Sequence, residues 1–218
     1  MCFSPTASFV TAGLTAVVGA FALSRVNEPR ELPLAATPLL FALQQTIEGL
    51  LWLDRPMAPE GSVATGLVGL FLFFAEVFWP VYAPLAVWLI EPNAARRRLM
   101  LLCLAAGVGV SGYLLQWILT HPHSAIVRDG HIVYVTAFRP SAAVAVAYLA
   151  ATGLPLALST RRAVVALGAV VLIGTVVAFA FYWEAFVSVW CFFAAAASLV
   201  ILSHFEWSRR HRLRIANA

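Results

Sequence analysis

Three polar side chains stand close together in an otherwise apolar stretch, LLFALQQTIEGLLW (39–52). Gln44 and Glu48 are four positions apart and Gln45 and Glu48 are three apart, so an α-helix places all three on one side. A carboxylate inside a bilayer costs about 2–3.5 kcal/mol, so this side is expected to face the protein interior. The group predicts either a functional site, with Glu48 as general base or ligand, or a protonated glutamate that only joins helices.

Glu76 and the cysteines extend the candidate site. Glu76 lies in the middle of a later apolar stretch, where the same two interpretations apply. Cys2 follows the first residue, and Cys191 lies in FVSVWCFFAAAAS. Both are expected in the outer half of a helical bundle, where they form a disulfide if their Cα atoms lie within about 7 Å. Together with Glu48 and a histidine they would instead suit zinc or copper.

Three of the five histidines follow the fourth apolar stretch. His121 and His123, in THPHS, are interpreted as residues of a solvated loop rather than a metal-binding tract. His131 opens HIVYV, an alternating apolar segment that also contains Tyr134. We expect this segment to fold back over the mouth of the bundle, which would bring His131 to the site.

Composition determines which elements must position these residues. The chain has 218 residues, of which 62% are hydrophobic and only 11% charged, whereas soluble domains carry about 25% charged residues. We therefore expect one all-α membrane domain over 1–218, with about seven transmembrane helices. The expected spans are Ala7–Ser24, Leu32–Leu53, Val63–Ile90 (kinked near Pro80 and Pro84), Leu99–Thr120, Ser141–Leu158, Ala163–Trp183 and Ala185–His204.

The basic residues predict the orientation of these spans. All 14 are arginines, and eleven of them fall on one side of the expected bundle. The remaining three, Arg55, Arg128 and Arg139, fall on the other. The positive-inside rule makes the richer side cytoplasmic, with the N-terminus outside and the C-terminus inside. This predicts a multi-pass protein of the inner (plasma) membrane, with the bilayer as its partner and no nucleic acid, because no aromatic-interleaved basic face is present.

Several segments resemble an uncharacterised bacterial membrane-protein family that opens Met-Cys-Phe-Ser. They are MCFSPTASF, PLLFALQQTIEGLLW, FWPVYAPLAVWLIEP, GHIVYV and FVSVWCFFAAAAS. The resemblance covers nearly the whole chain and implies a polytopic membrane protein of unknown function. The matching positions are Cys2, Ser4, Gln44, Gln45, Glu48, Trp52, Trp79, Pro80, Glu91, His131, Tyr134, Trp190 and Cys191, and the resemblance attaches no role to them. Glu91 is expected in a cytoplasmic ion-pair cluster with Arg96–Arg98.

Two function classes follow from these residues. A retinal protein is excluded because the chain has no lysine, and a ceramidase-like zinc hydrolase is disfavoured because no aspartate is membrane-embedded. The first class is a metal- or thiol-dependent enzyme with an outward-opening site. Its catalytic residues would be Glu48, Cys191 and His131, its metal ligands Cys2, Cys191, Glu48 and His131, and its further ligand contacts Gln44, Gln45, Glu76 and Tyr134. The second class binds a small ligand or metal without turnover, for transport, sensing or assembly.

Overall fold

The computed structural model describes residues 4–54, 63–136, 141–182 and 197–216, together with Phe186, Val189, Trp190, Phe193 and Ala195. Within this part the chain is mostly helical, as predicted. The helices are α1 (Pro5–Leu23), α2 (Leu32–Leu53), α3 (Val63–Leu72), α4 (Trp79–Ile90), α5 (Ala94–Thr120), α6 (Ala142–Leu158), α7 (Arg162–Phe181) and α9 (Ser198–Ala216). A 3₁₀ turn (Pro29–Glu31) precedes α2, and a π-helical segment (Phe73–Phe78) joins α3 to α4. An antiparallel hairpin, β1 (His123–Arg128) and β2 (His131–Thr136), follows α5.

Five helical segments of the described chain are long and apolar enough to cross a membrane. They are Pro5–Leu23, Pro29–Leu53, Thr65–Ile90, Ala94–Thr120 and Arg162–Phe181, while Ala142–Leu158 is apolar but shorter. Local sequence sets several of their starts. Ser4, Asn93 and Ser141 each accept a hydrogen bond from a backbone N–H three residues on, which satisfies one free donor of the first turn. These helices therefore have the length and the apolar composition of membrane-spanning helices.

Two predicted helix boundaries are wrong. The fourth helix begins at Ala94 rather than Leu99, because Asn93 caps it and the three arginines that follow are good helix formers. The last helix does not end at His204 but continues to Ala216 through the arginine-rich tail, which contains neither proline nor glycine. Six of the first ten residues of the predicted span Ala185–His204 lie outside the described residues, so its N-terminal half stays a prediction.

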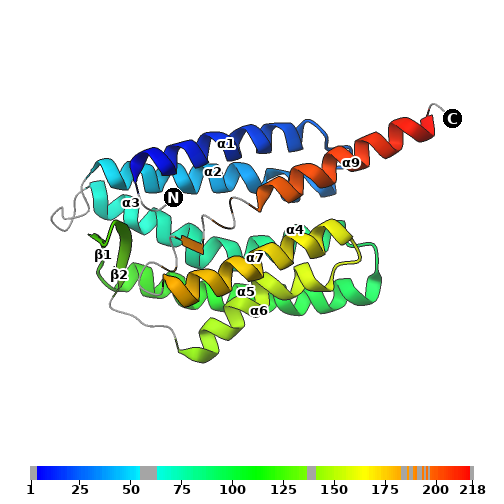
Figure 1. The fold of residues 1–218 in the computed structure, drawn as a ribbon. Coiled ribbons are helices and arrows are strands. Elements are labelled where there is room, and N and C mark those ends of the chain that lie inside the picture. The colour runs from blue at the N-terminus through cyan, green and yellow to red at the C-terminus, as the bar shows by residue number, and fades with distance from the viewer. Residues whose placement is uncertain are drawn as a thin grey trace.

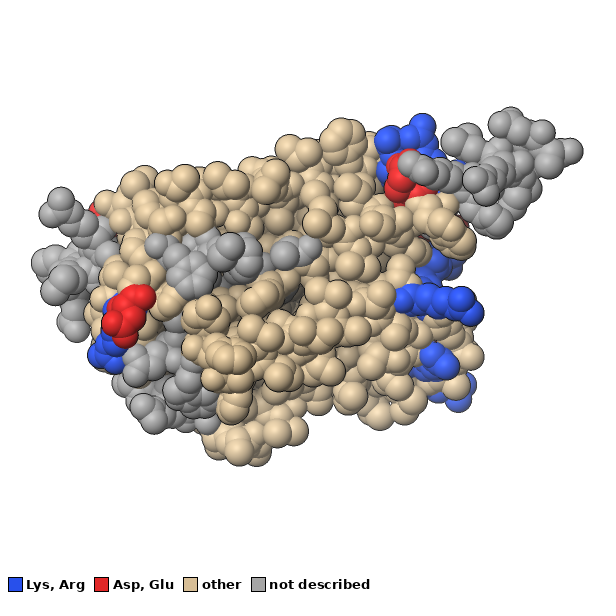
Figure 2. Space-filling view, viewed as in Figure 1, with Lys and Arg blue, Asp and Glu red and all other residues tan. Residues whose placement is uncertain are grey.

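The helices form two groups (Figure 1). Helices α1, α2 and α9 pack along one side of the molecule, and α4, α5, α6 and α7 along the other. Helix α1 begins at the end that carries the hairpin, whereas α9 runs out past the opposite end. Figure 2 shows most of the basic side chains gathered at this opposite end, called the basic end below. Arg25, Arg30, Arg96–Arg98, Arg161 and Arg162 adjoin the helix termini there.

The π-helical segment is explained by Pro80 and by neighbouring helices. Pro80 has no amide hydrogen to donate within the helix, and the N–H of Trp79 bonds the carbonyl of Phe74, five residues back. Two carbonyls of the segment accept hydrogen bonds from other helices, Ala75 from the Tyr148 hydroxyl (2.5 Å) and Val77 from the Ser111 hydroxyl (2.6 Å). The irregular backbone of this segment is thus stabilised by donors from α5 and α6.

Glu91 does not lie in the expected ion-pair cluster. Its carboxylate is 2% exposed and accepts four hydrogen bonds from neutral groups: the Asn93 N–H, the Ser159 hydroxyl, and both the N–H and the hydroxyl of Thr160 (2.8–3.1 Å). Burial alone would raise the pKa of Glu91, but these hydrogen bonds outweigh it and hold the pKa below its usual value. The carboxylate therefore joins the end of α4 to the α6–α7 turn.

The arginines nearby bind other partners. Arg161 donates to the carbonyl of Ile90 (3.0 Å) and Arg96 to that of Leu158 (2.7 Å), so each guanidinium satisfies the last turn of a helix. The guanidinium of Arg97 lies 4.5 Å from the ring centre of Trp88. The ion-pair prediction is wrong because helix carbonyls and an aromatic ring compete for these cations.

Candidate functional site

The three polar residues of α2 are buried, as their spacing predicts. Gln44, Gln45 and Glu48 are all 0% exposed. The amide of Gln45 donates to the Glu48 carboxyl group (3.3 Å), and the indole N–H of Trp79 donates to Gln44 Oε1 (2.9 Å). The Trp79–Gln44 hydrogen bond therefore ties α2 to the start of α4, whereas the Gln45–Glu48 bond lies within α2. None of the three lines either of the cavities described below.

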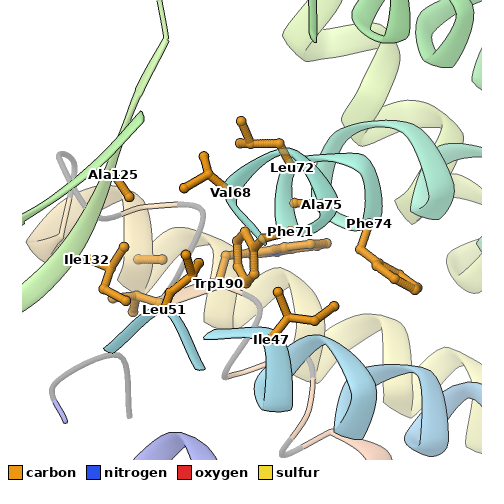
Figure 3. Packing of buried hydrophobic residues seen from close by; sticks show 12 residues of the cluster. Ile47, Leu51, Val68, Phe71, Leu72, Phe74, Ala75, Ala125, Ile132 and Trp190 are labelled. Carbon is orange, nitrogen blue, oxygen red and sulfur yellow. The ribbon is translucent and has the colours of Figure 1, made fainter. Parts of the chain in front are cut away.

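A hydrophobic cluster beside these polar residues of α2 holds the hairpin against the helices (Figure 3). Ile47 and Leu51 of α2 and Phe71 of α3 belong to the same buried cluster as Ala125 and Ile132 of the hairpin. The ring of Tyr134 stacks on Phe71 with ring centres 4.5 Å apart. The prediction that HIVYV folds back onto the bundle is therefore confirmed.

His131 lies at the start of β2, with its ring edge-on to Tyr182 at 5.5 Å between ring centres. Burial lowers the pKa of His131, and the negative charge of Asp129 offsets part of this effect. The imidazole is thus biased towards its neutral form, which can accept a proton or bind a metal. Its predicted role as ligand or proton shuttle stays a prediction.

The hairpin itself has a signal that the sequence analysis missed. Asp129 and Gly130 are the two loop residues, both with positive φ (49° and 74°), and Arg128 pairs with His131 directly across them. This is the type I′ geometry that an Asp-Gly pair favours between alternating apolar strands. The dipeptide between SAIVR and HIVYV could have predicted both strands and their register.

A second carboxyl group within an apolar helical segment lines a small cavity at the hairpin end. The cavity measures about 20 Å³, and Glu76 shares its lining with Leu72, Trp117, Ile118, His121, Pro122, His123 and Thr136. Glu76 belongs to the π-helical segment, so the irregular backbone presents a carboxyl group towards the C-terminal end of α5. Among the described residues no donor forms a hydrogen bond or ion pair with Glu76. The solvated-loop interpretation of THPHS is therefore incomplete, since both histidines join a site.

The hydrogen bonds of the two histidines fix which ring nitrogen is basic. Thr120 donates its hydroxyl hydrogen to the carbonyl of Gln116, so it accepts from Nδ1–H of His121 (2.8 Å). Nδ1 of His123 lies 3.3 Å from the carbonyl oxygen of His121, which can only accept. In the neutral rings this leaves Nε2 as the nitrogen with a lone pair. In each neutral ring Nε2 is therefore the nitrogen that can accept a hydrogen bond.

The predicted metal and thiol chemistry gains no support from the described residues. Cys2 and Cys191 lie outside them, so neither the disulfide nor the shared ligand set with Glu48 and His131 can be placed. Cys103, the described cysteine, is partly buried on α5 and has a free thiol. Within the described ranges, no group of three His, Cys, Asp or Glu side chains lies close enough to hold a metal ion.

Comparison with known families matches residues 1–218 to one model, "Family of unknown function (DUF6629)". This confirms the resemblance to an uncharacterised family that the sequence motifs indicated. No curated protein and no solved structure gives a significant match to the chain.

Proposed function

The chain belongs to the DUF6629 family, and from that premise we propose that it is a multi-pass inner-membrane protein that binds a proton or small hydrated cation at Glu76. The cation enters from the outer side of the membrane, past the hairpin. Binding serves transport or sensing rather than turnover. One observation carries the proposal: an intramembrane carboxyl group lines a cavity and lacks a partner among the described residues.

The cost of such a carboxyl group supports a functional role. A charge at this depth costs about 2–3.5 kcal/mol by insertion scales, and ionisable residues inside membranes usually mark ion or proton paths. Glu48 and Glu91 show how this chain satisfies other buried carboxyl groups, with hydrogen bonds from neutral donors. Glu76 has no such bond in the described part, so a proton or cation is the group that would balance it.

The size of the cavity limits the ligand. A site for one water molecule needs about 10–15 Å³ measured in this way, so about 20 Å³ admits one or two. An organic substrate does not fit, whereas a hydronium ion or a partly hydrated metal ion does. Because no group of three His, Cys, Asp or Glu side chains in the described ranges could hold a metal ion directly, a proton or a cation that keeps its water is favoured.

Infrared spectroscopy of the purified protein tests whether Glu76 binds a proton. The C=O stretch of a protonated carboxyl group is distinct from carboxylate bands, so its change with pH reports protonation directly. We expect a titrating carboxyl band in the wild type that is absent in Glu76→Gln. Glu48→Gln is the matched control, because it removes a buried carboxyl group that lines neither cavity, and it should keep this band.

Titration with a cation at fixed pH tests whether Glu76 binds a cation. If a cation binds, NaCl should raise the melting temperature of the wild type and of Glu48→Gln but not of Glu76→Gln. A titrating band without any cation effect would assign the site to protons alone. The proposal is wrong if Glu76→Gln keeps both the titrating band and every cation response of the wild type.

A further inference from the structure

A second cavity, distinct from the Glu76 site, lies between the two helix groups. It measures about 70 Å³ and is partly open. Its lining comes from five helices and Trp190: Leu34, Thr37, Phe41, Trp79, Tyr82, Ala83, Ala86, Val87, Thr152, Leu156, Leu167, Val171 and Ile201. We propose that this cavity binds an acyl-chain segment of an anionic phospholipid whose head group lies at the basic end.

The polar side chains in the lining offer no free hydrogen to a ligand. Their N–H and O–H groups already donate elsewhere: Thr37 and Tyr82 to the carbonyl of Pro33, Trp79 to Gln44, Thr152 to the carbonyl of Tyr148, and Trp190 to Thr175. Water needs two to four polar partners to occupy a cavity. The occupant is therefore apolar.

The depth of the cavity matches one leaflet. Leu34 and Phe41 lie two and nine residues inside the basic end of α2, which is about 3–14 Å at 1.5 Å per residue. Ala83 and Val87 lie seven and three residues inside the same end of α4. Half of a bilayer's hydrocarbon core is about 15 Å thick, so the cavity lies at the level of the acyl chains of that leaflet.

Volume and charge specify the lipid. An apolar cavity of about 150 Å³ binds one benzene molecule, so about 70 Å³ takes a few methylene groups and not a sterol. A chain at this depth carries its head group to the basic end, where Arg98 and Arg162 are exposed. Guanidinium groups at a membrane surface favour anionic head groups. Phosphatidylglycerol is therefore preferred over phosphatidylcholine.

Two tryptophans in the lining make the proposal measurable. Trp79 and Trp190 are quenched only by lipid that comes close to them, and bromine on an acyl chain quenches at short range. We expect vesicles of brominated phosphatidylglycerol to quench more fluorescence than brominated phosphatidylcholine at equal mole fraction. Ala86→Leu fills the cavity and should lose this excess, while Ala105→Leu, at an exposed position on α5, should keep it.

Each outcome of the quenching experiment tests one part of the proposal. Equal quenching in wild type and Ala86→Leu overturns the acyl-chain site, and equal quenching by the two lipids overturns the anionic head group. Size-exclusion chromatography shows whether Ala86→Leu folds. If it does not, Ala83→Val, which fills less of the same cavity, replaces it and should also reduce the excess quenching by phosphatidylglycerol. Trp117 of the Glu76 cavity is unchanged between wild type and Ala86→Leu, so it does not contribute to the difference between them, and the two proposals fail independently.

Discussion

Three glutamates in α2–α4 differ in what surrounds their carboxyl groups. Glu48 pairs with the Gln45 amide on its own helix, and Glu91 accepts four hydrogen bonds from neutral donors. Glu76 lines a cavity and has no hydrogen bond among the described residues. The hydrogen bonds of Glu48 and Glu91 stabilise the fold, whereas Glu76 would lose no such bond if its charge or its ligand changed. This contrast favours Glu76 over Glu48 as the residue that binds the proposed proton or cation.

Glu91→Gln tests the structural role at the basic end. Glutamine keeps the shape but replaces an acceptor oxygen with an NH₂ group that faces N–H and O–H donors. We expect a loss of about 2 kcal/mol at pH 7, measured as a lower melting temperature in detergent. Asp54→Asn, at an exposed carboxyl group after α2, should change stability by less than about 0.5 kcal/mol.

The sign of the pH dependence follows from the lowered pKa of Glu91. A carboxylate whose folded-state pKa is depressed stabilises fully above the unfolded pKa of about 4.3, and this contribution is lost as pH falls through the folded-state value. The gap between wild type and Glu91→Gln should therefore narrow in acid. A gap that persists unchanged at acid pH would contradict the hydrogen-bonded carboxylate.

At the scale of elements, sequence patterns predict helix positions better than helix irregularities. The bounds Leu32–Leu53 of α2 agree with the prediction because charged residues flank an apolar run of membrane length. Pro80 predicts a disturbance in the third span, but its form depends on donors from Tyr148 and Ser111, far away in the sequence. The same holds for the Glu76 cavity, because the hairpin that closes it joins α3 only through tertiary packing.

Gly107→Ala tests how the start of α4, directly after the π-helical segment, packs on α5. A Cβ at Gly107 would lie 1.9 Å from the carbonyl oxygen of Pro80, so α5 could not keep its approach to α4. We expect a loss of about 3 kcal/mol, although Gly→Ala inside a helix normally gains up to about 1 kcal/mol. Gly109→Ala, where a Cβ meets nothing within 4 Å, should be neutral or stabilising. Equal melting temperatures for the two variants would rule out this contact.

At the scale of the molecule, the division of the helices into two groups could not be predicted from the sequence. Nearly every face of these helices is apolar, so periodicity does not distinguish a face that packs on protein from one that meets lipid. The arginines are more informative, because the described ones gather mainly at one end, as their distribution over the expected spans requires (Figure 2). Which side of the membrane that end faces stays a prediction from the positive-inside rule.

A cysteine-labelling experiment checks the orientation. In a background with Cys2, Cys103 and Cys191 replaced by serine, we expect Asp129→Cys to react with an impermeant maleimide on intact cells. Asp129 is a loop residue of the hairpin, at the end with few arginines. Arg98→Cys, exposed at the basic end, should react only after lysis. The reverse pattern would turn the Glu76 cavity towards the cytoplasm, and the cation would then have to enter from inside, against the proposed function.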